Sequence, residues 1–233
     1  MEILVTGSSG EIGTNLCLKL KKEGHEVFGI DKRKNTWTKN FDYLMLDLSQ
    51  KFFDFKEGFG DAKIPFTPEA VVHFAANAKV HELVENPSRA MDNIKITFNV
   101  LEYCRQNNIP IIFASSREVY GDIHRFNINE LITDEKKADF QFTESPYSAS
   151  KISGEALIYS YAKCYALPYI IFRFSNVYGR FDNDLERMGD LAVNIAERTL
   201  ELLQEPLLKP LIDIPRMAEL AQAMVTDSLD AFV

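Results

Sequence analysis

Hydrophobic residues in the first 181 positions alternate between short apolar runs and longer stretches with helical spacing. This alternation is typical of a parallel β-sheet with helices on both faces, because parallel strands need a crossover segment between them. The pattern predicts six strands, at residues 2–5, 26–30, 43–47, 70–74, 109–114 and 169–174, and helices at residues 12–23, 87–107 and 146–165. We therefore expect an α/β fold, a doubly wound parallel sheet of about six strands.

The composition changes near Arg180. Residues 1–181 contain 22 basic and 23 acidic side chains, whereas residues 182–233 contain 4 and 11, so most of the net charge of −8 belongs to the tail. Apolar residues in the tail recur at three- and four-residue steps on either side of Pro206 and Pro210, which predicts a helical hairpin. Two domains are expected, at residues 1–181 and 182–233.

The overall composition is that of a globular protein, with 46% hydrophobic and 26% charged residues. A net negative charge without a basic cluster argues against nucleic acid or an anionic membrane as a partner. No apolar run reaches the length of a membrane span, and the first residues enter a strand pattern instead of a signal peptide. Cys17, Cys104 and Cys164 lack metal-binding spacing, which favours buried free thiols. The expected location is the cytoplasm.

A glycine-rich segment, TGSSGEIG at residues 6–13, joins the first predicted strand to the first predicted helix. Gly7 permits a tight turn, Gly10 lets the backbone approach a pyrophosphate, and Gly13 lets the helix pack on the strand. The positive end of the helix attracts the same anion. The segment predicts a Rossmann dinucleotide site, and the alternative is a glycine-rich turn in a flavodoxin-like sheet.

An acidic residue, Asp31, ends the second predicted strand, 18 residues after Gly13. A carboxylate at this position accepts hydrogen bonds from both adenosine ribose hydroxyls and repels a 2′-phosphate. The sequence therefore favours NAD. Lys32 and Arg33 follow directly and leave NADP as an alternative.

A tyrosine and a lysine, Tyr147 and Lys151, lie four residues apart at the start of a predicted helix and so share one face. An ammonium near a phenol favours the phenolate, which predicts a lowered pKa for Tyr147. Ser116 follows the fifth predicted strand, at the edge where open α/β sheets bind ligands. The three residues form a candidate catalytic group, and the alternative for the helical pair is a solvated helix face.

Residues 1–181 resemble the extended short-chain dehydrogenase/reductase family, specifically its NAD-dependent nucleotide-sugar epimerases and dehydratases. The matching segments are residues 6–13, 47–48, 73–76, Asn93, 115–121, 147–151 and 173–179. The resemblance implies that Tyr147 is the general base, that Lys151 holds the nicotinamide ribose and that Ser116 bonds the reacting sugar oxygen. It also implies that Asp47 and Leu48 flank the adenine.

The motif and the resemblance together assign NAD contacts to Gly7, Ser9, Gly10, Glu11, Ile12, Gly13, Asp31, Asp47, Leu48, Phe74, Ala75, Ala76, Asn93, Tyr147 and Lys151. Asn176 and Arg173 are the substrate contacts that the resemblance implies, with Asn176 on the diphosphate of a nucleotide sugar. It further implies a homodimer, formed through the helices at residues 87–107 and 146–165.

One departure from the family bears on the reaction. The 4,6-dehydratases present an Asp-Glu pair after the catalytic Ser or Thr, whereas this chain has Arg117 followed by Glu118. A guanidinium cannot donate the proton that dehydration needs. The sequence thus favours 4-epimerisation, or a decarboxylase-like reaction that uses Glu118. The alternative is an exposed ion pair with no catalytic role.

The tail, residues 183–233, resembles PhoU-type regulators of phosphate uptake. Those proteins bind metal clusters through acidic motifs that Glu186 and Asp190 match, but one copy gives an incomplete site, and the alternative is a solvated helix face. Residues 183–188 fit either parent family, which suggests recombination, a designed chimera or a sequence-level error. The epimerase resemblance implies a smaller sugar-binding domain after residue 181, and the tail in its place predicts impaired turnover. Two other functions therefore stay open, an NAD-binding module without turnover and a phosphate-signalling adaptor.

Overall fold

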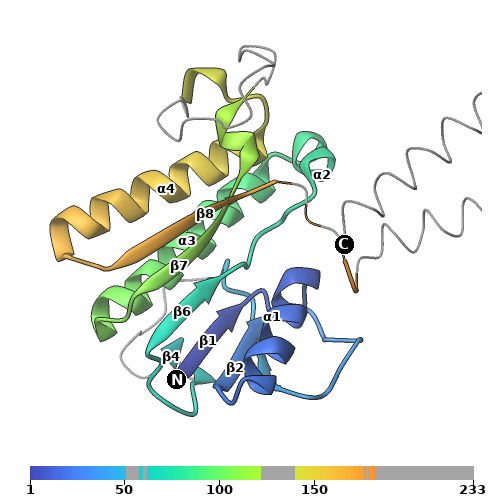
Figure 1. Ribbon diagram of the computed structural model, residues 1–233. Helices are drawn as coiled ribbons and strands as arrows, with labels where there is room; N and C mark the ends of the chain where they lie inside the picture. The colour runs from blue at the N-terminus through green and yellow to red at the C-terminus, as the bar shows by residue number, and fades with distance from the viewer. Residues whose placement is uncertain (51–57, 60–61, 122–139, 176, 178, 182–233) are drawn as a thin grey trace, which may run out of the picture. The chain divides into compact units, whose positions relative to one another are not determined.

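The computed structural model describes residues 1–50, 58–59, 62–121, 140–175, 177 and 179–181 (Figure 1). The chain divides into two units, Met1–Asp182 and Asn183–Val233, and all described residues belong to the first. The predicted hairpin at residues 182–233, the candidate metal ligands Glu186 and Asp190, and the predicted substrate contact Asn176 lie outside the described residues.

A six-stranded parallel sheet forms the centre of the first unit, in the order β3-β2-β1-β6-β7-β8 (Figure 1). Its strands are β1 (Glu2–Thr6), β2 (Glu26–Asp31), β3 (Asp42–Met45), β6 (Ala70–His73), β7 (Ile111–Ser116) and β8 (Tyr169–Phe174). The strand order reverses between β1 and β6, which is the switch point where open α/β sheets bind ligands. The predicted α/β fold class is confirmed, and no predicted strand end is more than two residues away from the observed one.

The α-helices of the described residues are α1 (Glu11–Lys22), α2 (Val80–Glu85), α3 (Ser88–Asn107) and α4 (Pro146–Tyr165). Two short 3₁₀-helices, η1 (Arg117–Tyr120) and η4 (Phe140–Phe142), and a small antiparallel pair, β4 (Gly58–Phe59) with β5 (Ala62–Lys63), complete the unit. The sequence pattern predicts α1, α3 and α4 but misses α2. A helix of six residues has too few apolar positions to show a period.

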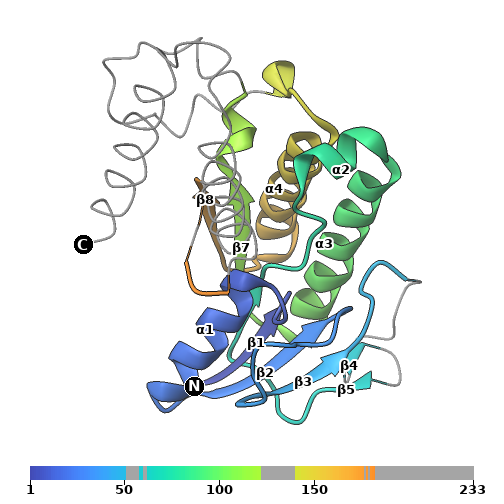
Figure 2. The same ribbon diagram turned by 90° about the vertical axis from the view of Figure 1, so that its right-hand side faces the viewer.

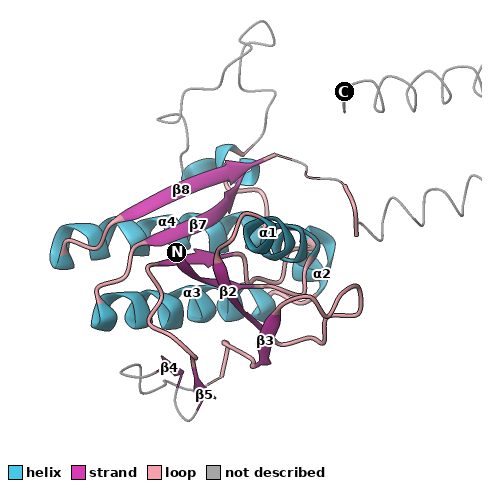
Figure 3. Cartoon of the chain, turned by 60° about the horizontal axis from the view of Figure 1, so that its bottom comes forward, coloured by secondary structure: helices cyan, strands magenta, loops and turns pink. Residues whose placement is uncertain are grey.

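The helices cover both faces of the sheet (Figures 2 and 3). Leu4, Val71 and Phe113 point to one face, where they pack in one cluster with the α3 and α4 residues. Their strand neighbours Val5 and Val72 point to the other face and pack with residues of α1. Successive side chains of a strand alternate between faces, so both layers come from the same apolar runs.

Cys17 and Cys104 are buried free thiols, as predicted, whereas Cys164 on α4 is a free thiol on the surface. The sequence could not separate them, because burial depends on which side of the helix meets the sheet. Each helix in the described part of the chain is too short or too polar to cross a bilayer.

Candidate functional site

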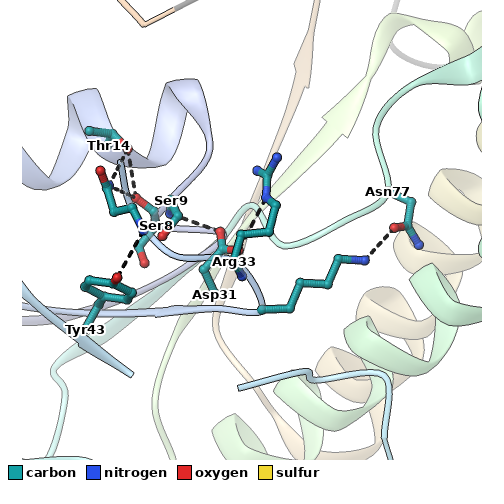
Figure 4. A network of polar contacts seen from close by, with 9 residues as sticks. Ser8, Ser9, Thr14, Asp31, Arg33, Tyr43 and Asn77 are labelled. Carbon is teal, nitrogen blue, oxygen red and sulfur yellow. Dashed lines mark hydrogen bonds and ion pairs between the residues drawn. The ribbon is translucent and has the colours of Figure 1, made fainter. Parts of the chain in front are cut away.

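The glycine-rich segment forms a tight turn between β1 and α1 (Figure 4). Gly7 has a φ of +74°, and its amide donates to the Ile30 carbonyl at 2.7 Å. A Cβ at Gly7 would lie 2.7 Å from the Ala75 nitrogen, and a Cβ at Gly13 would collide with the Gly7 carbonyl oxygen. A Cβ at Gly10 would lie 3.2 Å from that same oxygen. The backbone geometry of the turn therefore depends on glycine at positions 7 and 13, whereas a side chain at position 10 would only be tight.

Asp31 ends β2 directly beside this turn (Figure 4). Its buried carboxylate accepts hydrogen bonds from the Ser9 amide at 3.0 Å and the Arg33 amide at 2.8 Å. The Arg33 side chain also lies 3.7 Å from the carboxylate, while the Lys32 ammonium donates to the Asn77 side chain at 2.8 Å. The structure thus brings the glycine motif and the acidic residue together, as the sequence predicts.

Two buried hydroxyl groups at the turn, those of Ser8 and Ser9, have no hydrogen-bond partner in the described part of the chain. Buried polar groups without partners are costly and need an explanation. Helix α1 begins here with Glu11 and Ile12, and its N-cap, Gly10, supplies no side-chain hydrogen bond to the first amides. A helix N-terminus attracts an anion such as a pyrophosphate, and free hydroxyl groups beside it can donate to that anion. The residues present therefore fit NAD.

Asn35 supports the turn from beneath, and the sequence analysis missed it. Its buried side-chain amide donates to the Thr14 hydroxyl at 2.9 Å and to the Ser8 carbonyl at 3.4 Å. Its side-chain oxygen accepts from the Trp37 amide at 3.0 Å, and its own amide donates to the Tyr43 hydroxyl at 3.0 Å. No local pattern marks Asn35, because two of these partners come from the preceding helix and turn.

The predicted NAD contacts Phe74, Ala75 and Ala76 follow β6. The Phe74 amide donates to the Thr6 carbonyl at 3.0 Å, which places this segment against the start of the glycine-rich turn. The Thr6 hydroxyl also contacts Nδ1 of His73 at 2.7 Å. Burial and the charge of Lys151 lower the pKa of His73 to about 3, so this imidazole is neutral at physiological pH.

The predicted adenine contacts Asp47 and Leu48 differ in environment. The Asp47 carboxylate accepts from the Ser49 amide and hydroxyl at 2.9 and 2.7 Å. Burial opposes the charge of Asp47, but these hydrogen bonds and two lysine charges leave its pKa below the usual value. The Leu48 side chain belongs to the hydrophobic core, so only its backbone can face a ligand.

Asn93 on α3 is buried and joins the loop after β6 to α4. Its side-chain oxygen accepts from the Asn77 amide at 2.7 Å, and its side-chain nitrogen donates to the Ser150 hydroxyl at 3.1 Å. The Ser150 hydroxyl in turn donates to the Tyr147 carbonyl at 2.7 Å. Asn93 therefore uses both ends of its amide within the protein, and the geometry makes it a positioning residue for the start of α4.

The candidate catalytic group comes together from β7 and α4. Ser116, Tyr147 and Lys151 have exposed fractions of 9%, 9% and 6%. The Ser116 hydroxyl accepts from the Glu118 amide at 3.2 Å and acts on the Tyr147 phenol, and the Lys151 ammonium lies 5.8 Å from the centre of the Tyr147 ring. The ammonium itself donates to the Ala114 carbonyl at 2.7 Å. Three residues that the sequence places on two elements thus share one buried site.

The electrostatics of this group correct one prediction. Burial raises the pKa of Tyr147, the hydrogen bond from Ser116 lowers it, and the charge of Glu118 raises it further, with a net upward shift. The sequence predicts a lowered value from the charge of Lys151 and from that of an oxidised nicotinamide. Burial also lowers the pKa of Lys151 to about 8, against the opposing charge of Glu155. The prediction was wrong in direction because the sequence does not reveal how deeply the phenol is buried.

Arg117 and Glu118 form an ion pair, with 3.5 Å between nitrogen and oxygen, and the Arg117 side chain is 45% exposed. This geometry agrees with the alternative of a surface pair, although the effect of Glu118 on Tyr147 shows that its charge reaches the site. Arg173, the predicted substrate contact, forms a two-bond ion pair with Glu155, at 2.9 and 2.7 Å. Arg173 on β8 is therefore paired with a residue of α4.

Comparisons with known proteins agree with this architecture. Residues 3–212 match the sequence model described as the NAD dependent epimerase/dehydratase family. The chain is 35% identical over 200 residues to a putative UDP-glucose 4-epimerase from Methanocaldococcus jannaschii, covering 83% of this chain and 61% of that protein. It is 34% identical over 194 residues to Protein CapI from Staphylococcus aureus, covering 77% of this chain and 55% of that protein.

The fold is also similar to the crystal structure of a UDP-glucose 4-epimerase from Thermus thermophilus in complex with NAD. The TM-score is 0.67 with 32% identity, over 78% of this chain and 58% of that one. The chain thus spans little more than half the length of the proteins that it resembles. The family match ends at residue 212, inside the predicted tail, so the expected family limit of 181 is too short. The PhoU resemblance and the domain boundary stay predictions.

Proposed function

Because the chain belongs to the NAD dependent epimerase/dehydratase family, we propose that it binds NAD and carries the catalytic residues of a nucleotide-sugar 4-epimerase. One observation carries the proposal. Ser116, Tyr147 and Lys151 are buried together at the carboxyl ends of the strands, the same edge of the sheet as the glycine-rich turn and Asp31. Ligands of open α/β sheets bind at this edge.

The turn and Asp31 hold the dinucleotide in this proposal. The Ser8 and Ser9 hydroxyls and the N-terminus of α1 would meet the pyrophosphate, and Asp31 would accept from the adenosine ribose. When bound, NAD would supply a hydride acceptor that later returns the hydride, so the reaction would have no net redox change.

Tyr147 is the proposed general base, which removes the proton of the sugar C4 hydroxyl. Its raised pKa keeps the phenol protonated at neutral pH, so it needs added positive charge to act as a base. Lys151 is placed to supply part of that charge, because its ammonium faces the ring. In this proposal Ser116, which acts on the phenol, also bonds the reacting sugar oxygen.

A nucleotide-diphosphate sugar is the proposed substrate, as the names of the relatives suggest. Epimerisation is preferred over dehydration because Arg117 stands where a dehydratase needs an acid. A second candidate is NAD binding without turnover. Arg173 and Asn176 are proposed to contribute to the sugar site. Arg173 contributes indirectly, because it joins β8 to α4.

The test is interconversion of UDP-glucose and UDP-galactose by the purified chain with NAD. We expect impaired but measurable turnover by the wild type and none by Tyr147→Phe, which keeps the ring but loses the acidic proton. Exposed Tyr169→Phe is the matched control and should behave as the wild type. Undiminished turnover in Tyr147→Phe would refute the assignment. Tight NAD binding without turnover in the wild type would favour the second candidate.

A further inference from the structure

The carboxylate of Glu155 joins α4 to two strands next to the candidate catalytic group. It lies one turn after Lys151 on α4 and is 5% exposed. Its oxygens accept from the Ser115 hydroxyl on β7 at 2.5 Å and from the Arg173 guanidinium on β8 at 2.9 and 2.7 Å. Arg173 also donates to the Tyr120 hydroxyl on η1 at 3.1 Å and stacks over that ring. A buried carboxylate is thus held by two neighbouring strands.

Helix α4 approaches β7 closely along this line. A Cβ at Gly154 would lie 2.8 Å from the Phe113 ring, so the helix rests on the strand at that point. The next two residues of the strand also contact α4. The Ala114 carbonyl accepts from Lys151, and the Ser115 hydroxyl donates to Glu155. These contacts fix the register between α4 and β7, and that register sets the position of Lys151 relative to the end of the strand.

We propose that Glu155 is a positioning residue for Lys151: held by Ser115 and Arg173, it keeps the lysine in place as a cation beside Tyr147. This role deepens the proposed function and rests on it. A buried ammonium that has lost its hydration needs a nearby carboxylate to remain charged. In this structure the ammonium donates to the Ala114 carbonyl, and Glu155, one helical turn away, acts on it through its charge.

The charges around Lys151 support the same conclusion. Burial lowers its pKa to about 8, and the charge of Glu155 acts in the opposite direction. The other titratable groups facing this region are His73 on β6, which is neutral, Tyr147 on the same helix and Glu118 on η1. The Arg173 charge on β8 is paired with Glu155. Loss of the Glu155 charge therefore removes support that the neighbouring groups do not replace.

A purely structural role for the ion pair makes a different prediction, and two variants separate the roles. Glu155→Gln and Arg173→Gln both break the same pair, but only the first removes the negative charge near Lys151. The measurement is the titration of Lys151 by NMR in the full chain with ¹³Cε-labelled lysine, with the signal assigned by its loss in Lys151→Met. We expect Glu155→Gln to lower the midpoint by about one pH unit or more, and Arg173→Gln to leave it unchanged or raise it. Equal shifts in both variants, or none in either, would overturn the proposal.

A double variant covers the case in which a single variant fails to fold. Removing one partner of a buried pair leaves an uncompensated charge, whereas Glu155→Gln combined with Arg173→Gln removes both. The double variant should show the same lowered midpoint as Glu155→Gln, and a wild-type midpoint would overturn the proposal. Calorimetry with NAD on the wild type tests the proposed function separately. If NAD does not bind, the function fails, while the Lys151 titration still decides the role of Glu155.

Discussion

Replacement of Asp31 by asparagine tests the cofactor site in the most quantitative way. The carboxylate accepts from the Ser9 amide with one oxygen and from the Arg33 amide with the other. Asparagine has the same shape but a single acceptor oxygen, so one of these amides loses its partner. An unpaired buried donor costs about 1–3 kcal/mol. For a chain of this size, each 1 kcal/mol lowers Tm by about 2–4 °C.

The effect on affinity should be larger than this structural cost suggests. A hydrogen bond to a charged group stabilises by about 1.5–3 kcal/mol, and 1.4 kcal/mol is a factor of ten in affinity. Loss of the charge that accepts from the ribose should weaken NAD binding by about ten- to hundredfold. The preference for NAD over NADP should also fall, because Asp31 no longer repels a 2′-phosphate and Arg33 stands beside it.

Calorimetric titration of both cofactors into the wild type and Asp31→Asn gives the four affinities needed. Asp42→Asn is a matched control, since Asp42 is an exposed aspartate at the start of β3. We expect its affinities to equal those of the wild type. Tighter binding of NADP than of NAD by the wild type, or an unchanged preference in Asp31→Asn, would refute this account of cofactor choice.

Three further predictions follow from the geometry. Gly13→Ala should abolish NAD binding and lower Tm in a thermal melt, because the added methyl collides with the Gly7 carbonyl oxygen; normal binding would contradict the packing described. The folded-state pKa of Lys151 is about 8, below its ordinary value of 10.5, so the unfolded chain binds more protons between these limits and stability rises with pH there. Thermal melts should therefore show that the Tm of Lys151→Met falls relative to the Tm of the wild type as the pH rises from about 8 to about 10.5. A constant Tm difference would refute the shift. Light scattering should show a homodimer that Met91→Asp on α3 weakens, since Met91 is 65% exposed, and a monomeric wild type would contradict this.

The fold and half of the site could be predicted from the sequence because their signals are local. The two-residue and 3.6-residue periods locate the strands and long helices, and Gly7, Gly10 and Gly13 are contiguous with them. Asp31 is recognisable because it ends a strand at a set distance from the glycines. Tyr147 and Lys151 are recognisable because four residues make one helical turn.

The supporting residues carry no such signal. Glu155 meets Ser115 from 40 residues away, and Asn35 meets Ser8 from 27 residues away. The pKa of Tyr147 and the core position of Leu48 depend on burial, which is a property of the assembled layers. The short helix α2 has no period to read. Tertiary partners and burial are therefore what the sequence does not reveal.

The central claim is that NAD lies on the glycine-rich turn, and the single tryptophan of the chain gives a direct test. Asn35 holds the Trp37 backbone and also bonds the Ser8 carbonyl of the turn, so Trp37 lies close to the proposed site. The measurement is energy transfer from Trp37 to added NADH, the reduced form of the cofactor. We predict saturable quenching of Trp37 with matching NADH emission in the wild type, and neither in Gly13→Ala. Calorimetric binding of NADH to the wild type without energy transfer would place the cofactor elsewhere and contradict the account.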